Sequence, residues 1–271
     1  MLFVQISDLH YLRHGVLSFG EVDTHACLER CVAQIKSMSP QPDAVLITGD
    51  LTNDGDLEAY QALADLLAEL DLPLYPIPGN HDDRELIRKA FPSIASLSPD
   101  GPLCYVIEDY PVRILALDSS VDNDVRGYLG ALQLDWLNTK LAEKTDQPTI
   151  VMLHHPPFKT GIGHMDYSML GDAEDLASLI REHHHVERVL CGHVHRAVQT
   201  RYAGTLAQIP PGIAHQVKLV LGHERGPWNS EPPGYLLHYW QAEAGLITHQ
   251  VPIGNYEPEG RFDQPHTGLS A

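Results

Sequence analysis

The chain has 271 residues, of which 43% are hydrophobic, enough for a substantial core in one large domain or two ordinary ones. Its formal net charge of -18 repels polyanions at long range, which argues against nucleic acid as the main partner and favours small substrates. No apolar run approaches the roughly 20 residues that a membrane span needs, so we expect no membrane partner.

The N-terminal segment and the cysteines indicate the cellular compartment in which we expect the protein. Residues 2–7 read directly as a strand and not as a secretion signal, so we expect a cytoplasmic protein. The cysteines lack a C-x-x-C spacing, so neither a zinc knuckle nor a disulfide framework is indicated, and we expect reduced thiols. They are Cys27, Cys31, Cys104 and Cys191.

The first third of the chain alternates strands and helices. Apolar runs predict the strands, and apolar residues at helical spacing predict the helices. This alternation is typical of a doubly wound sheet. The predicted strands are 2–7, 43–47 and 73–77. One predicted helix has Asp23 or Thr24 as its N-cap, and a second predicted helix spans 56–70.

The remainder departs from this alternation. Strands at 103–107 and 112–117 are joined by a tight turn, and helices at 130–143 and 172–182 alternate with strands at 149–153 and 186–190. No convincing helix follows, which suggests a second sheet built late in the chain. The late strands are predicted at 197–202, 206–209, 214–220, 234–239 and 246–251.

Neither an internal repeat nor a domain linker is visible, so we predict a single domain over residues 1–253. The Gly- and Pro-rich stretch 222–233 is expected to protrude, and as an arm it could pair subunits into a homo-oligomer. Residues 254–271 lack periodicity and are expected to form an irregular tail.

Thr48-Gly49-Asp50 ends the strand at 43–47 and presents a carboxylate at the edge of the sheet. In open α/β sheets that carboxyl edge is where ligands bind. An aspartate there more often caps the next helix, so Asp50 alone would be weak evidence.

Four other predicted strands end in similar groups. Each group supplies oxygen or nitrogen donors beside a Gly or Pro. In Asp8-x-His10 and His193-x-His195, the i, i+2 spacing puts both side chains on one face of an extended segment. The full set is Asp8 and His10, Asp50, Asn80 and His81, His154 and His155, and His193 and His195.

These motifs resemble those of the calcineurin-like metallophosphoesterases, in the same order and over about 190 residues. Three segments, 6–8, 77–83 and 154–157, are also similar to those of bacterial class III cyclic-nucleotide phosphodiesterases. They are more closely similar to the glycerophosphodiesterases of that group. Segment 212–217 also resembles the glycerophosphodiesterases. The order of elements fits the αββα fold of this family, two mixed β-sheets packed as a sandwich with helices on the outer faces.

The resemblance implies two divalent metal ions. It assigns Asp8, His10 and His195 to one ion and Asn80, His154 and His193 to the other, with Asp50 as the bridge. Oxygen donors and imidazoles without a thiolate suit Mn, Fe, Co or Zn. Two such ions can activate a bridging hydroxide and clamp phosphate oxygens.

A charge count explains the amide at Asn80. Two divalent ions bring four positive charges, Asp8 and Asp50 remove two, and a bridging hydroxide removes a third. The remaining positive charge matches a phosphodiester monoanion, whereas a carboxylate at position 80 would have cancelled it.

By the same resemblance, His81 lies over the substrate and either stabilises developing charge or protonates the leaving alkoxide. Some family members place an Asp where this chain has Asn53, so a carboxylate-polarised His81 is in doubt. His155 is expected to support the ligands, and His215 to lie near the second metal. We include Asn53, His155 and His215 as candidates for substrate contact.

Substrate specificity is expected in the loops 11–22 and 159–170, where Arg13, Phe19 and His164 could contact the substrate, although plain loop roles are commoner. His183-His184-His185 resembles a metal-binding tract. Solvated histidines are common at a helix end, where a cation complements the dipole, so we do not count this tract as a site.

The resemblance implies metal-dependent hydrolysis of small phosphodiesters, namely glycerophosphodiesters, with promiscuity toward cyclic nucleotides and phosphomonoesters. One alternative is a nuclease or DNA-repair phosphoesterase on the same core, which the acidic composition disfavours. Another is a non-catalytic scaffold with this fold, which would be expected to have lost ligands that are all present here.

Overall fold

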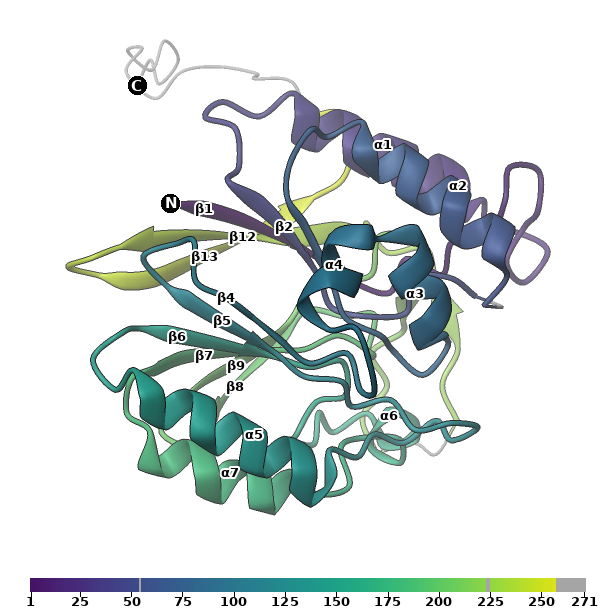
Figure 1. Cartoon of the computed structure of the whole chain (residues 1–271). Helices are drawn as coiled ribbons and strands as arrows, with labels where there is room; N and C mark the ends of the chain where they lie inside the picture. The colour runs from purple at the N-terminus through teal and green to yellow at the C-terminus, as the bar shows by residue number, and fades with distance from the viewer. Residues whose placement is uncertain (54, 223–224, 257–271) are drawn as a thin grey trace, which may run out of the picture.

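Two mixed β-sheets face each other in the computed structural model, which describes residues 1–53, 55–222 and 225–256 (Figure 1). The first sheet has five strands, in which β1, β2 and β3 run parallel and β12 and β13 are antiparallel additions. Its order is β13 (Gly245–Pro252), β12 (Gly234–Gln241), β1 (Leu2–Ile6), β2 (Ala44–Ile47) and β3 (Leu74–Pro76).

The second sheet has six strands, with a parallel centre and an antiparallel strand at each edge. Its order is β4 (Tyr105–Ile107), β5 (Arg113–Ala116), β6 (Thr149–Met152), β7 (Val186–Leu190), β9 (Thr205–Ile209) and β8 (Val198–Tyr202). A small separate pair joins β10 (Gln216–Val217) to β11 (Trp228–Asn229). The predicted sandwich of two mixed sheets is therefore confirmed.

The expectation of a second sheet built from the late strands is wrong. Strands β8 and β9 extend the second sheet beside β7, whereas β12 and β13 return to the first sheet beside β1. The physical reason is that β1 and β7 each have an open edge whose backbone groups need partners, and the late strands supply them. Of the strand predicted at 214–220, only Gln216–Val217 pairs.

Helices cover the outer faces of both sheets (Figure 1). Helices α1 (Thr24–Lys36) and α2 (Leu57–Ala68) lie over the first sheet, and α5 (Gly130–Glu143) and α7 (Ala173–Glu182) lie over the second. Asp23, and not Thr24, is the N-cap of α1, because its side chain accepts a hydrogen bond from the Ala26 amide. Three helices too short for a periodic pattern were not predicted: α3 (Arg84–Ala90), α4 (Pro92–Leu97) and α6 (Gly163–Asp166).

Alternating residues of the central strands divide the apolar core. On β5, Ile114 and Ala116 belong to the cluster that also contains buried residues of α1 and α2, whereas Leu115 belongs to the cluster that contains buried residues of α5 and α7. A strand buried on both faces reads as a continuous apolar run, which is why the sequence predicted it well. The four cysteines are free thiols, and Cys191 packs within the second cluster.

Several predictions concern segments at the edge of what the structure describes. Within 222–233, the Gly222 amide donates to the Gly161 carbonyl at 2.9 Å, so this part of the stretch contacts the loop before α6. Residues 223, 224 and 257–271, including most of the predicted tail, lie outside the described residues. Among the helices of the described chain, none has the length and apolar character needed to cross a bilayer.

A buried polar network crosses between the sheets. The side chain of His238 on β12 is completely buried, with Nε2 3.0 Å from Gln5 Oε1 and Nδ1 2.9 Å from the Thr248 hydroxyl. The Gln5 amide nitrogen in turn donates to the Cys191 carbonyl at 3.0 Å. Both ring nitrogens of His238 are therefore satisfied by the fold.

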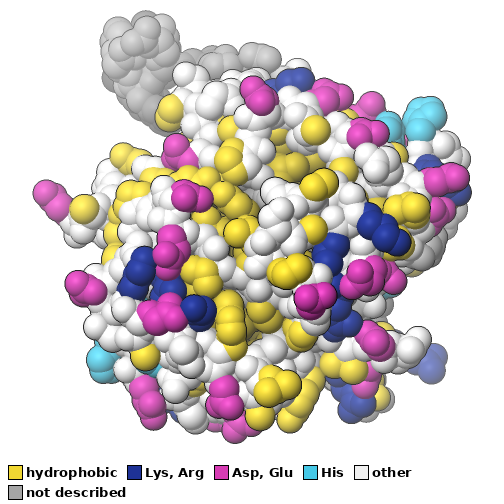
Figure 2. Space-filling model, viewed as in Figure 1, with side chains coloured by type: hydrophobic (Ala, Val, Ile, Leu, Met, Phe, Trp, Pro, Cys, Tyr) yellow, Lys and Arg dark blue, Asp and Glu magenta, His cyan; other side chains and the backbone are white. Residues whose placement is uncertain are grey.

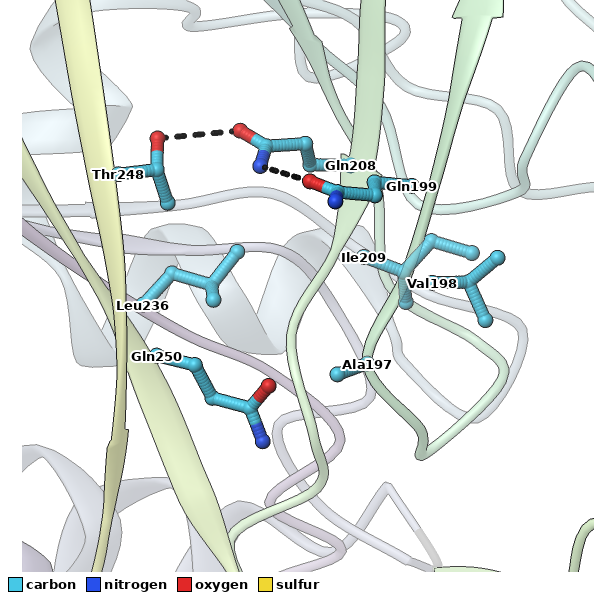
Figure 3. A pocket seen from close by; sticks show the side chains of 8 residues that line it. All are labelled: Ala197, Val198, Gln199, Gln208, Ile209, Leu236, Thr248 and Gln250. Atoms are coloured by element: carbon cyan, nitrogen blue, oxygen red, sulfur yellow. Dashed lines mark hydrogen bonds between the residues drawn. The ribbon is translucent and has the colours of Figure 1, made fainter.

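A pocket of about 280 Å³ opens beside this network, between β8 and β9 of one sheet and β12 and β13 of the other (Figure 3). At its wall, Gln208 is hydrogen bonded to Thr248 and to Gln199 (Figure 3). None of the predicted site residues lines it. The lining residues are Ala197, Val198, Gln199, Gln208, Ile209, Leu236, Thr248 and Gln250.

Candidate metal centre

The loops that follow β1, β2, β3, β6 and β7 meet at one end of the two sheets. Strands β1, β2 and β3 are parallel to one another, and so are β6 and β7, so their carboxyl ends gather at common edges. The structure therefore brings together donors from both sheets. Among the described residues, three groups of side chains have mutually close ligand atoms: Asp8, His10, Asp50 and His195; His10, His195 and His215; and His154, His155 and His193.

Asp50 lies between His10 and His154. Its Oδ2 atom is 3.4 Å from His10 Nε2 and also 3.4 Å from His154 Nε2. His10 Nε2 in turn lies 3.0 Å from His195 Nε2, and His193 Nδ1 lies 3.2 Å from His154 Nε2. A single carboxylate oxygen thus faces one histidine pair on each side, which is the geometry required of a bridging ligand.

Five of the candidate ligands have a left-handed backbone. The φ angle is positive at Asp8, His10, Asp50, His193 and His195, with values from 42° to 73°. This region is sterically unfavourable for residues with a Cβ, and such residues persist only where the surrounding structure holds them. Their concentration at the strand ends is typical of a functional site.

Glycines allow this close approach of backbone and side chains. A Cβ atom at Gly79 would lie 2.1 Å from Asp50 Oδ1, and one at Gly49 would lie 2.3 Å from His154 Nδ1. Any larger residue at either position would displace a candidate ligand. The glycines in the strand-end motifs are therefore required for the geometry of the cluster.

Polar atoms within the cluster lack partners. Asp8 Oδ2, His10 Nδ1 and Asn80 Oδ1 are buried and make no hydrogen bond within the described part of the chain. Burying such atoms without a partner costs free energy, and a cation bound to the carboxylate and amide oxygens would offset that cost. Carboxylate, amide and imidazole donors in this number fit divalent cations, so the residues present suit the metal ions that the sequence motifs imply.

Burial keeps most of these histidines neutral. It lowers the pKa of His10 and of His193 well below the usual range and lowers that of His195 to about 4. His154 is the exception, because Asp50, Asp8 and the Thr48 carbonyl together outweigh the effect of burial and raise its pKa to about 9. Neutral imidazoles offer a lone pair to a cation, and a cation bound beside Asp50 would replace the proton on His154.

Hydrogen bonds fix which nitrogen of each ring faces the cluster. The Thr48 carbonyl accepts from His154 Nδ1 at 2.8 Å, so Nε2 carries the free lone pair. For His193 the arrangement is reversed. The Ser168 hydroxyl donates to the Met165 carbonyl and therefore accepts from His193 Nε2 at 2.7 Å, which leaves Nδ1 free.

Sequence reasoning assigned no role to Ser168 or Asp82. The Asp82 carboxylate accepts hydrogen bonds from the amides of Leu51 and Gly79 and from the Tyr60 hydroxyl, so it ties the loops after β2 and β3 together. Burial, with the nearby Asp50, raises its pKa to about 6. The only indication in the sequence was its position directly after Asn80-His81.

His81 lies at the open side of the cluster, with its side chain exposed. Its Nδ1 lies 3.0 Å from the backbone carbonyl oxygen of Asn53, and its amide donates to Asp50 Oδ1 at 3.0 Å. The ring packs edge-on against His10, with 4.7 Å between centroids. A backbone carbonyl therefore orients this histidine, so the absence of an aspartate at position 53 does not leave it without a partner.

His155 is buried behind the cluster. Its Nδ1 lies 2.8 Å from the Ser119 hydroxyl, and a Cβ at Gly127 would lie 2.4 Å from the ring. Its Nε2 has no hydrogen-bond partner among the described residues and lies close to the ligand atoms of His154 and His193. Burial lowers its pKa to about 3.

His215 lies beside the other half of the cluster. Its ring centroid is 4.5 Å from that of His195 and 5.4 Å from that of His10. The expectation that it would lie near the second metal is wrong as stated, because its neighbours are the histidines assigned to the first. His215 directly precedes β10, whose pairing with β11 could not be read from the sequence.

The three loop residues named from the sequence have different positions. Phe19 contacts His215, with 5.1 Å between ring centroids, and so lies at the edge of the cluster. Arg13 is held by Glu58 and Asp56 at the start of α2. His164 packs against Gly226, and no group of metal-binding geometry within the described residues includes it or the tract 183–185.

Comparisons with known proteins support this interpretation of the cluster. Residues 1–197 match the family model described as calcineurin-like phosphoesterase. A probable glycerophosphodiester phosphodiesterase (GpdQ) of Arcobacter nitrofigilis is 38% identical over 259 residues, which are 95% of each chain. The 3',5'-cyclic adenosine monophosphate phosphodiesterase CpdA of Escherichia coli K12 is 30% identical over 79% of this chain and 77% of its own.

The fold also has solved counterparts. A dimetal phosphatase from Danio rerio superimposes with a TM-score of 0.65, covering 94% of this chain and 99% of its own, at 15% sequence identity. At that identity the likeness concerns the fold alone.

Proposed function

The chain belongs to the calcineurin-like phosphoesterase family, and on this premise we propose that it hydrolyses small phosphodiesters with the help of two divalent metal ions. The observation that carries the proposal is the position of Asp50 Oδ2, 3.4 Å from a histidine of each half of the cluster. The proposed ligands are Asp8, His10, Asp50, Asn80, His154, His193 and His195.

In this proposal, Asp8, His10 and His195 hold one ion and Asn80, His154 and His193 hold the other. When bound, the two ions supply Lewis acidity, which lowers the pKa of water and neutralises phosphate oxygens. Oxygen and imidazole donors suit Mn, Fe, Co or Zn, and the native pair depends on which metals are available.

The charge of the ligand set favours a diester substrate. Only Asp8 and Asp50 bring negative charge, because Asn80 contributes a neutral amide oxygen whose buried Oδ1 has no other partner in the described chain. The loaded site therefore keeps positive charge for a phosphodiester monoanion.

His81 is proposed as the residue that stabilises or protonates the leaving alkoxide. Its Nδ1 donates to the Asn53 carbonyl, which leaves Nε2 as the nitrogen that exchanges a proton with the substrate. His155 and His215 line opposite ends of the cluster and are proposed, with Asn53, as residues that support or contact the substrate.

The relatives suggest two kinds of diester. Their names specify glycerophosphodiesters and cyclic nucleotides, and we propose that this chain accepts both, with weaker activity on phosphomonoesters. A nuclease activity on the same core is less favoured. On the face shown in Figure 2, acidic side chains are spread over the whole view, with Lys and Arg scattered among them, and the chain carries a net charge of -18.

Location and assembly are also proposals. The four free cysteines, three of them buried, fit a reducing compartment such as the cytoplasm. A homo-oligomer paired through residues 222–233 stays a prediction, and a monomeric mass in solution would reject it.

The test is hydrolysis by metal-stripped protein reconstituted with Mn, Fe, Co or Zn. A glycerophosphodiester, a cyclic nucleotide and a phosphomonoester are compared side by side. Metal-dependent turnover that collapses in Asn80→Ala but persists in Asn138→Ala, a change at an exposed asparagine of α5, is the expected result. Folded protein that turns over none of the three with any metal would indicate a non-catalytic scaffold instead.

A further inference from the structure

Phe19 is held in an unusual position at the mouth of the candidate site. Its backbone is left-handed, with φ of 53°, and its side chain is 61% exposed. The pairing of Ser18 with Val22, whose carbonyl accepts from the Ser18 amide at 2.8 Å, closes the turn that maintains this conformation. A strained backbone and an exposed aromatic ring are both unfavourable, so stability does not explain them.

A second aromatic ring lies against Phe19. Trp228 on β11 stacks on it with 5.3 Å between centroids and 17° between ring planes. Neither ring belongs to the hydrophobic clusters formed by the described residues. The two come from distant parts of the chain, so the tertiary structure alone builds this pair, which we call the aromatic wall.

The aromatic wall continues directly into the metal centre. The ring of His215 packs edge-on against Phe19 at 5.1 Å and against Trp228 at 6.2 Å. On its other side, His215 is 4.5 Å from His195, one of the proposed ligands. Only the ring of His215 thus separates the aromatic wall from the proposed metal ligand His195. A group esterified to a phosphate at the metal centre could therefore reach the wall.

We propose that the aromatic wall, Phe19 and Trp228, binds the planar base of a nucleotide diester while its phosphate occupies the metal centre. This inference rests on the proposed function and names the substrate class that the site favours. A base stacks on an aromatic face, whereas the flexible polyol of a glycerophosphodiester presents no such face.

The kinetic test compares two substrates in Phe19 variants of the metal-loaded enzyme. For 3',5'-cyclic AMP, Phe19→Ala should lower kcat/KM about tenfold, mainly by raising KM. For glycerophosphoethanolamine, the change should stay within about twofold, since no ring contact is lost. Phe19→Trp should retain the activity on cyclic AMP, and Phe19→Leu, which keeps apolar bulk without a ring, should lose it as Ala does.

A matched control is Val16→Ala, which removes another exposed apolar side chain from the same loop and should leave both substrates unaffected. Equal losses on both substrates in Phe19→Ala, or full activity in Phe19→Leu, would overturn the stacking role.

A binding measurement separates this inference from the proposed catalytic activity. Calorimetric titration of metal-loaded protein with AMP and with glycerol 3-phosphate should show about tenfold tighter binding of AMP, and Phe19→Ala should abolish that difference. If the wild-type protein hydrolyses nothing but still prefers AMP through Phe19, the function fails and the aromatic wall stands. If AMP and glycerol 3-phosphate bind equally, the wall is rejected whether or not the protein hydrolyses diesters.

Discussion

The hydrogen-bond network around His238 and the metal centre are both buried, and they differ in whether protein groups satisfy their polar atoms. Around His238, both ring nitrogens have protein partners, Gln5 and Thr248. In the metal centre, buried atoms of Asp8, His10 and Asn80 have none within the described chain. A buried polar group whose hydrogen bonds are all made within the protein indicates a structural role. Several buried polar atoms without protein partners in one place indicate a ligand-binding site.

The backbone differs in the same way. His238, Gln5 and Thr248 lie on regular strands, β12, β1 and β13. The proposed ligands Asp8 and His195 lie just beyond strands, with left-handed φ angles of 55° and 48°. The network around His238 therefore stabilises the sandwich. The metal centre has an unfavourable backbone and side-chain arrangement, which persists because the surrounding sandwich is stable.

The sharpest test of this comparison is Asp8→Asn. We expect about a thousandfold loss of metal-dependent turnover, because a charged ligand is lost from the site. The metal-free protein should not become less stable, because an asparagine Oδ1 can still accept from the His193 amide and a neutral amide costs less to bury than a carboxylate, whose pKa burial here raises to about 7. Turnover assays and thermal unfolding in chelator measure the two effects. A fall in the unfolding midpoint would show that Asp8 is structural.

The opposite result is expected for His238→Ala. Removing this ring deletes the hydrogen bonds to Gln5 Oε1 and to the Thr248 hydroxyl and creates a cavity, at a cost of about 3 kcal/mol in the free energy of unfolding. Activity per folded molecule should persist, because the ring contacts no proposed ligand. Urea unfolding checks the prediction, with His249→Ala on the exposed face of β13 as the control. Equal destabilisation by the two changes would contradict it.

A smaller effect is expected where a hydrogen bond only orients a ligand. Ser168→Ala removes the acceptor of His193 Nε2 and should weaken metal affinity about tenfold through loss of the correct tautomer. Metal titration of chelator-treated protein measures this effect. Ser178→Ala, on the exposed side of α7, serves as the control. Unchanged affinity in Ser168→Ala would mean that the hydroxyl does not select the tautomer.

A more gradual effect is expected from pH. Burial, with the nearby Arg188, lowers the pKa of His238 to about 3, below its usual value of 6.5. Between pH 6.5 and 3, His238 is therefore protonated in the unfolded chain but not in the folded chain. Its contribution to the free energy of unfolding is complete above pH 6.5 and is lost as the pH falls toward 3. This one residue contributes a slope of up to about 1.4 kcal/mol per pH unit.

Unfolding measured between pH 7 and 4 in the wild type and in a His238→Gln variant tests this linkage. The variant cannot titrate, so its stability should fall less steeply with acid. Identical slopes would show that other groups dominate acid unfolding.

Local patterns predicted the parts of the fold with strong periodicity. The helix at Gly130–Glu143 and the strand at Val186–Leu190 have the predicted bounds, because a long amphipathic segment and an apolar run encode their structure locally. Short helices such as α4, and the sheet that each late strand joins, lie beyond such patterns because they depend on contacts distant in the chain.

By itself, the sequence determined which side chains follow the apolar strands, and therefore that Asp50, His154 and the other donors would gather at one edge. The order of the motifs and their position at the ends of apolar runs are local properties, which is why this much could be read from the chain. Only the tertiary structure decided the partners: Ser168 against His193, the Asn53 carbonyl against His81, and Trp228 against Phe19. These pairs join loops far apart in sequence, and their geometry exists only once the two sheets have packed.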